Sequence, residues 1–179
     1  MALNVAQGSS DKGEWLQWMS IRFGMPSPLN NASLHGCVRA TMQAGYDEAF
    51  IDRAMPGLTV TLPLITAGCV QVAQLGSGEV VGVVIVTATS LQGIALLYGM
   101  FVEPAHWKRG VGRVLFEAAA TRAKVLKAGV LVIYAEPSAE GFYRRMGAIR
   151  AGEGTFYYSP EIVLPQLLYI LPRDTVSNT

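Results

Sequence analysis

A glycine-containing turn with basic residues, near the middle of the chain, has the composition of a phosphate-binding site. The segment Val102–Leu115 reads VEPAHWKRGVGRVL, so Lys108 and Arg109 come directly before Gly110 and Gly112. Glycines let the backbone approach a ligand and let successive N–H groups point one way. The N-terminus of the following helix adds free N–H donors and partial positive charge. These residues together predict a cradle for a pyrophosphate group.

The common phosphate-binding motifs fit this segment poorly. A P-loop has four residues between its glycines and continues with Lys-Ser or Lys-Thr, whereas one residue separates Gly110 from Gly112 and Arg113 follows. A Rossmann fingerprint needs a third glycine where this chain has Leu115, and it begins the first βα unit of a parallel sheet. For this motif alone, a glycine pair that only begins a helix remains the structural alternative.

A second segment, Ala135–Ala148, favours the phosphate-binding interpretation of the glycine turn. It reads AEPSAEGFYRRMGA and places Phe142 and Tyr143 in a helix that ends at Gly147. With the first segment it resembles the GNAT N-acetyltransferases, whose central motif is hydrophobic–Val–x–Pro, a basic turn and Arg-Gly-x-Gly before a helix. The next helix of that family ends in Phe-Tyr-x-x-x-Gly, as here. The resemblance covers about residues 70–149, and the pair of motifs is far more specific than either alone.

The resemblance implies an acetyl-CoA-dependent N-acetyltransferase that needs no metal. An acetyl group would move from acetyl-CoA to a primary amine by direct attack of the amine, and Tyr143 would act as the general acid for the leaving thiolate. A core aromatic with a satisfied hydroxyl is the alternative for Tyr143. The implied cofactor-binding residues are Met100, Phe101, Val102, Lys108, Arg109, Gly110, Val111, Gly112, Arg113, Ser138 and Tyr143. Met100 and Val102 would pair with the pantetheine amides as an added strand does.

The chain departs from the family pattern at three places. Trp107 stands where the family often has Gln or Arg, and Ser138 stands where an Asn often opens the second helix. The strand before Val102 carries no acidic residue, so the general base is open. Glu103 is the candidate that we name, as a possible base. The alternatives are Glu136, His35, His106, Tyr98 and a water molecule, with His106 also placed to meet phosphate.

The elements around these segments predict an α/β fold with a mixed, mostly antiparallel sheet flanked by helices. The resemblance implies a single GNAT-like domain, splayed at an acetyl-CoA cleft near residues 99–102. Strands are expected at 16–22, 69–75, 79–87, 94–102, 130–134, 155–159 and 166–171. Helices are expected at 34–44, 47–55, 110–127 and 137–146, the second of them ended by Pro56.

Composition restricts the class of partner. The net charge is +1 and only 15% of residues are charged, which argues against nucleic acid and membrane surfaces as partners. The apolar runs are shorter than the ~18 residues of a membrane span. A small-molecule amine is therefore the expected acceptor, and a homodimer is left open.

The domain expected over residues 15–172 follows a disordered extension at 1–14 and precedes a tail at 173–179. Without a signal peptide pattern, and with Cys37 and Cys69 expected to be reduced, the expected location is the cytoplasm. A non-catalytic acyl-CoA-binding module of the same fold is the alternative function.

Overall fold

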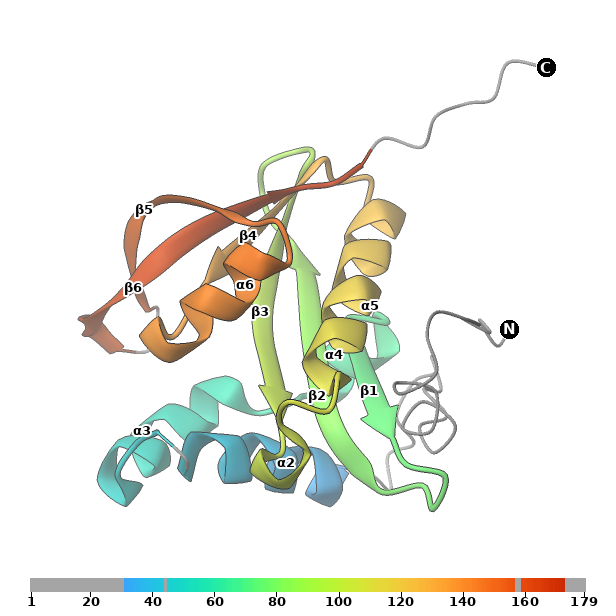
Figure 1. Cartoon of the computed structure of the whole chain (residues 1–179), viewed down its shortest axis with the longest axis vertical. Coiled ribbons are helices and arrows are strands. Elements are labelled where there is room, and N and C mark those ends of the chain that lie inside the picture. Colours follow the sequence, from blue (N-terminus) through green and yellow to red (C-terminus); the bar gives the residue numbers. More distant parts are fainter. Residues whose placement is uncertain (1–30, 44, 157–158, 173–179) are drawn as a thin grey trace. The chain divides into compact units, whose positions relative to one another are not determined.

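A computed structural model describes residues 31–43, 45–156 and 159–172. The extension expected at 1–14, the strand expected at 16–22 and the tail expected at 173–179 lie outside the described residues. The chain divides into two compact units. Unit 1 comprises Met1–Ile85 and Gly99–Ala118, and unit 2 comprises Val86–Tyr98 and Ala119–Thr179. Figure 1 shows the elements along the chain.

The strands form a six-stranded sheet in the order β1-β2-β3-β4-β6-β5. The pairs β1–β2, β4–β6 and β5–β6 are antiparallel, and β3–β4 is parallel. Their bounds are β1 Val70–Gln74, β2 Val80–Ala88, β3 Ile94–Val102, β4 Val130–Tyr134, β5 Ile149–Phe156 and β6 Ser159–Ile170. The mixed, mostly antiparallel α/β fold expected from the sequence is confirmed.

Among the described residues, unit 1 contains three helices before β1, the β1–β2 hairpin and the segment that leads into α5. The helices are α2 (Asn31–Gln43), α3 (Glu48–Leu58) and α4 (Leu62–Thr66), and α2 and α3 lie side by side in Figure 1. Asp47 caps α3 by accepting a hydrogen bond from the Phe50 N–H at 2.8 Å. Strand β2 is buried over its first seven residues, which explains its continuous apolar sequence.

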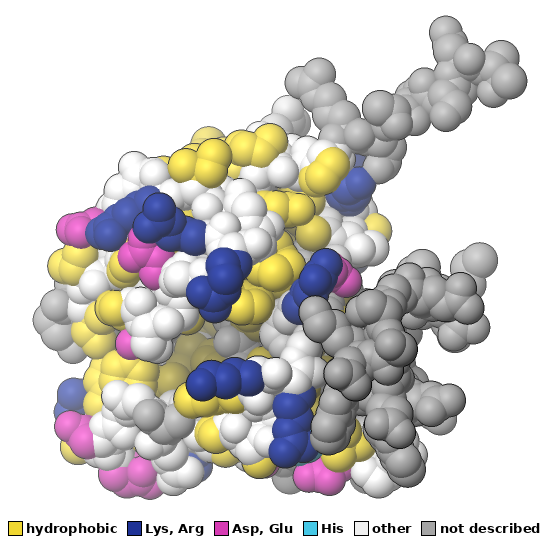
Figure 2. Space-filling model, in the orientation of Figure 1, with side chains coloured by type: hydrophobic (Ala, Val, Ile, Leu, Met, Phe, Trp, Pro, Cys, Tyr) yellow, Lys and Arg dark blue, Asp and Glu magenta, His cyan; other side chains and the backbone are white. Residues whose placement is uncertain are grey.

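Unit 2 has a sheet whose two faces differ in burial. Ala95, Leu97, Leu131, Ile133 and Leu167 are almost fully buried and form one face. Helix α6 (Glu140–Arg145) is preceded by a short 3-10 helix, η3 (Pro137–Ala139). Figure 1 shows β4, β6 and β5 side by side in this order. Over α6 and β5, acidic and basic side chains are intermixed at the surface (Figure 2), and Arg150 forms ion pairs with Glu140 and Glu153.

Several sequence-based boundaries agree with the structure, and others are wrong. Strands β3 and β4 begin and end as predicted. Helix α3 does not stop before Pro56 but includes it and continues to Leu58. This is tolerated because Pro56 lies in the last turn, where its missing N–H removes only one hydrogen bond. Strands β5 and β6 are both longer than predicted, since β5 begins at Ile149 and β6 contains Pro165.

Two further structural points concern the described residues. None of their helices combines the length and the apolar character needed to cross a membrane. Both cysteines, Cys37 and Cys69, are buried free thiols, as the sequence predicted.

Candidate functional site

The glycine turn predicted from the sequence lies between β3 and α5 (Val111–Val125) in unit 1. A 3-10 helix, η2 (Pro104–His106), follows β3, and the turn then reverses the chain with φ of 59° at Lys108 and 86° at Gly110. A positive φ is readily adopted by glycine and costs a side-chain-bearing residue about 1 kcal/mol or more. A Cβ atom placed on Gly110 would meet no described heavy atom within 4 Å, so the space in front of this backbone is open.

Helix α5 begins directly at this turn. The Val114 N–H donates to the Gly110 carbonyl at 3.2 Å, which makes Gly110 the first acceptor of the helix. The N–H groups of Val111, Gly112 and Arg113 therefore belong to the first turn, where a helix provides no carbonyl partner for them. Such first-turn N–H groups are the donors of an anion site at a helix N-terminus.

Close packing on β2 fixes the start of α5. A Cβ atom on Gly82 would lie 2.8 Å from Leu115 Cδ1 and 3.1 Å from Val111 Cγ1. Both contacts are shorter than side chains normally make, so only glycine at this position lets the first turns of the helix sit so close to the strand. The start of α5 is thus held against β2 by packing and not by the loop alone.

Positive charge gathers at the same turn. Lys108, Arg109 and Arg113 are all exposed. The Arg113 guanidinium also forms an ion pair with Glu117 at 3.0 Å, one helical turn further along α5. This ion pair lies on the helix surface and does not include Lys108, whose ammonium adds its own positive charge to the turn.

The last residues of β3 present backbone groups to two different edges. The Glu103 N–H donates to the Val81 carbonyl at 3.0 Å, toward β2. Because backbone groups alternate in direction along a strand, those of Val102 and Met100 point to the opposite edge. The parallel pairing of β3 with β4 covers Ile94–Leu97, and β3 continues beyond it to Val102. Binding of pantetheine amides by Met100 and Val102 stays a prediction.

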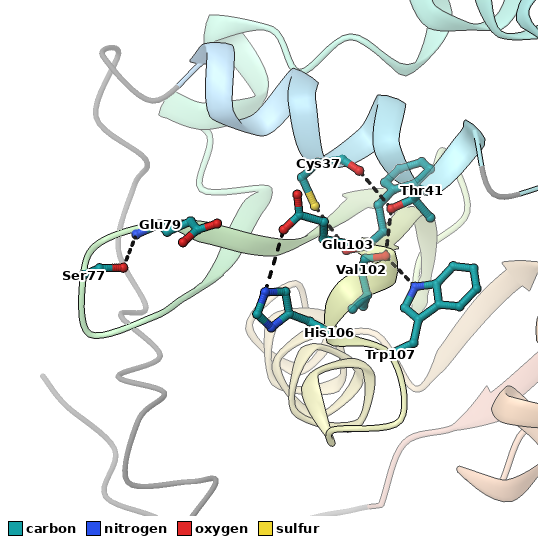
Figure 3. Close-up of polar contacts among 9 residues, drawn as sticks. Cys37, Thr41, Ser77, Glu79, Val102, Glu103, His106 and Trp107 are labelled. Atoms are coloured by element: carbon teal, nitrogen blue, oxygen red, sulfur yellow. Dashed lines mark hydrogen bonds and ion pairs between the residues drawn. The ribbon is translucent and has the colours of Figure 1, made fainter.

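The Val102 carbonyl, however, already accepts two hydrogen bonds within unit 1. Thr41 Oγ1 donates to it at 2.9 Å and Trp107 Nε1 donates at 2.6 Å (Figure 3). Thr41 Oγ1 also bonds the Cys37 carbonyl of its own helix at 2.8 Å. From the sequence, we expected both backbone groups of Val102 to be available to a ligand. In the structure the Val102 carbonyl accepts from two protein donors, so only the Val102 N–H is suited to a ligand.

Neither Cys37 nor Thr41 was identified from the sequence as part of the site. Thr41 is 61 residues from Val102 along the chain, and no local pattern signals this contact. Trp107 was noted only as a departure from the family pattern. Its indole now explains that departure, because it supplies a neutral donor to the end of β3.

The Cys37 thiol lies beside the same strand end. It contacts the Phe101 carbonyl at 4.0 Å. Burial, and secondarily the negative charge of Glu103, raise the pKa of the Cys37 thiol to about 12. The thiol is therefore protonated and unreactive at neutral pH, which excludes it as a nucleophile.

Glu103, the possible general base, lies in a small group of ionisable side chains in unit 1. Its carboxylate is 3.9 Å from His106 Nε2. Glu79, just before the start of β2, brings a second carboxylate into the same group (Figure 3). The proximity of Glu103 to His106 was not predicted, since the sequence placed His106 near phosphate.

Tyr143, Ser138 and Glu136 all belong to unit 2. Tyr143 is 6% exposed, and its ring meets that of Phe142 edge to face with centroids 5.2 Å apart. Burial raises the pKa of Tyr143 above its usual value. Such a phenol keeps its proton through the neutral range.

Glu136, one of the alternative bases, caps the 3-10 helix η3. Its carboxylate accepts from the Ser138 N–H at 2.8 Å and from the Ser138 hydroxyl. The Ser138 hydroxyl is thereby directed to Glu136. The remaining base alternatives, His35 on α2 and Tyr98 on β3, are both half-buried.

The comparisons with known proteins concern the domain and the fold. A model of the acetyltransferase (GNAT) domain matches residues 66–147, which include both sequence motifs except the final residue of the second. The chain is similar in structure to nourseothricin acetyltransferase, with 27% identity and a TM-score of 0.52, over 57% of this chain and 65% of that one. The chain thus spans less than two thirds of that protein. No curated protein sequence matches it significantly.

Two further solved structures share the fold over most of their length. The PaiA N-acetyltransferase of Thermoplasma acidophilum, in complex with coenzyme A, has 14% identity and a TM-score of 0.67, over 85% of this chain and 98% of that one. A GNAT family acetyltransferase of Brucella melitensis, in complex with acetyl-CoA, has 19% identity and a TM-score of 0.56, over 87% and 90%. The matched domain model identifies residues 66–147 as an acetyltransferase (GNAT) domain, and the two solved structures show that the fold is shared.

Proposed function

We propose that this chain transfers an acetyl group from acetyl-CoA to the primary amine of a small-molecule acceptor. The observation that carries the proposal is the basic glycine turn at the start of α5, with φ of 86° at Gly110 and open space in front of its backbone. This geometry suits a pyrophosphate, because N–H groups, the helix dipole and three exposed cationic side chains act together. The match to the acetyltransferase (GNAT) domain indicates that this pyrophosphate belongs to coenzyme A.

The turn and the strand end divide the work of binding. Lys108, Arg109 and the first N–H groups of α5 would hold the pyrophosphate. The N–H of Val102 and the backbone groups of Met100 would bind the pantetheine arm in the manner of an added strand. Thr41 and Trp107 would act as positioning residues, since both fix the Val102 carbonyl. Phe101 would contribute indirectly, because its side chain is buried.

The chemical step needs a neutral amine, a polarised thioester and a proton for sulfur. The amine nitrogen forms the new C–N bond, the C–S bond breaks, and the sulfur takes a proton. We assign that proton to the Tyr143 hydroxyl, whose burial keeps it protonated. The Val102 N–H is our candidate donor to the thioester oxygen.

Glu103 stays the candidate for accepting the proton that the amine loses. Its carboxylate is half-buried and lies beside His106. If the acceptor amine has a low pKa, water suffices, and Glu103→Gln will leave turnover unchanged. The pH dependence of kcat/KM in this variant separates the two cases.

A calorimetric titration tests the cofactor assignment. The wild-type chain should bind CoA and acetyl-CoA but neither NAD nor ATP. Gly110→Glu should abolish binding, since it places a negative charge in the cradle. Gly93→Glu is the matched control, because Gly93 also has a positive φ of 78° and no described atom within 4 Å of an added Cβ, but lies in the β2–β3 turn. Equal loss in both variants, or no CoA binding by wild type, would overturn the cofactor assignment.

An amine panel with detection of released thiol then tests the reaction. Release of CoA with an amine, and acetylation of that amine by mass spectrometry, is the expected result. CoA affinity without turnover on any amine would instead support the alternative, a non-catalytic acyl-CoA-binding module. The panel begins with small amines, because the chain has no strong charge that would favour a polyanionic acceptor.

A further inference from the structure

We propose that Glu79, Glu103 and His106 form a binding site for one divalent transition-metal ion, of which Zn²⁺ is the probe of choice. One oxygen of each carboxylate and one imidazole nitrogen lie within 4.8 Å of one another. All three residues belong to unit 1. The proposal does not rest on the function proposed above, although Glu103 is also the candidate base there.

The donor set fits a transition metal better than Mg²⁺ or Ca²⁺. Imidazole nitrogen together with carboxylate oxygen suits Zn²⁺ and its neighbours, whereas Mg²⁺ and Ca²⁺ prefer oxygen alone. In a tetrahedral Zn²⁺ site, bonds of about 2.0–2.1 Å place neighbouring donor atoms about 3.3 Å apart. The Glu103 oxygen and His106 Nε2 are 3.9 Å apart, which is close to this spacing.

The three ligands differ in how firmly they are placed. Glu103 and His106 are partly buried, with exposed side-chain fractions of 33% and 17%, and are three residues apart across η2. Glu79 is exposed and reaches the site from the β1–β2 turn, where its N–H lies 3.4 Å from Ser77 Oγ. Figure 3 shows Glu79, Glu103 and His106 approaching one another from these two segments. Water would fill the remaining coordination position.

Two converging carboxylates also favour a cation on electrostatic grounds. Like charges at this separation repel, and a dication between them converts the repulsion into attraction. The same ion would connect the β1–β2 turn to the segment that leads into Lys108. We therefore expect metal binding to stabilise the loop in front of the phosphate cradle.

The first experiment measures Zn²⁺ affinity of the tag-free chain after treatment with EDTA, by competition with a chromophoric chelator and without acetyl-CoA. One equivalent should bind. Glu79→Gln and His106→Ala should each weaken binding by about 10-fold or more, as loss of a direct ligand does. Glu153→Gln, which replaces an exposed carboxylate of unit 2, is the control and should bind as wild type does.

The second experiment uses the fact that the chain has only two histidines. In NMR spectra of the chain labelled with ¹⁵N-histidine, Zn²⁺ should shift the imidazole signals of His106 stoichiometrically and leave those of His35 in place. Glu79→Gln decides the question if His106→Ala fails to fold, because Glu79 is exposed and its substitution leaves the core intact. Unchanged affinity in folded Glu79→Gln, or a shift of His35 alone, would overturn the proposal.

Discussion

At the residue scale, the buried hydroxyl of Tyr143 carries the most specific chemical prediction. Tyr143→Phe should lower turnover at saturating acetyl-CoA by about 10²–10⁴-fold, the usual contribution of general acid catalysis. Affinity for CoA should change little, since the ring and its edge-to-face contact with Phe142 remain. Steady-state kinetics with the acceptor found in the amine panel measure the effect. Wild-type turnover in a folded variant would assign the proton to another donor.

Cys37 leads to a prediction about stability at alkaline pH. The pKa of its thiol rises from an ordinary value of 9.0 to about 12 in the folded chain, chiefly through burial. Between pH 9 and 12 the unfolded chain therefore loses this proton before the folded chain does, so the thiol's contribution to stability falls as pH rises. The difference in unfolding free energy between wild type and Cys37→Ala should shrink across this range. Urea titrations at several pH values test this, and parallel curves would contradict it.

The glycine turn before α5 was predictable from the sequence because its signal is local. Residues 108–113 are contiguous, and their basic and glycine residues are typical of a phosphate-binding turn. The contacts of Thr41 with Val102, and of Glu79 with Glu103, join residues that are far apart in the chain. Such contacts depend on how helices and strands pack, which no single segment encodes. Trp107 was the one signal in the sequence for the contacts at the end of β3, because its indole N–H needs a hydrogen-bond acceptor.

At the scale of elements, the cap of α3 gives a simple test. Asp47→Ala removes the acceptor for the Phe50 N–H and should destabilise the chain by about 1 kcal/mol. Asp52→Ala is the control, since this exposed residue makes a surface ion pair with Arg39 at 3.3 Å. Its cost should stay below about 1 kcal/mol. Chemical denaturation of the two variants measures the difference, and equal losses would contradict the capping role.

Element boundaries were predictable where an apolar run lies between two turns. The apolar runs of β3 and β4 are bounded by turns, and both strands match the prediction. Strand β5 was harder, because Gly152 and Gly154 interrupt its alternation. Gly154 is required by tertiary packing, since a Cβ atom there would lie 2.4 Å from the ring of Tyr134. The prediction therefore failed where packing, and not propensity, decides the residue.

At the scale of the whole molecule, ligand binding should appear as added stability. A ligand that binds only the folded chain, present at 100 times its Kd, stabilises by about 2.7 kcal/mol. Acetyl-CoA should therefore raise the unfolding temperature of wild type and of Gly93→Glu. Gly110→Glu should show no such rise. Thermal unfolding followed by circular dichroism measures the shifts, and a rise in Gly110→Glu equal to that of wild type would contradict the cradle.

Strand β5 has a consequence for the behaviour of the protein at high concentration. It is the last strand of the sheet order, so one of its edges has no partner strand among the described residues. An exposed edge invites pairing with another chain and thus aggregation. Here the register shifts between Arg150 and Gly152, and charged Arg150 and Glu153 lie along the strand. An irregular, charged edge resists intermolecular pairing, so neutral apolar substitutions at these two positions should lower the solubility limit without altering the fold.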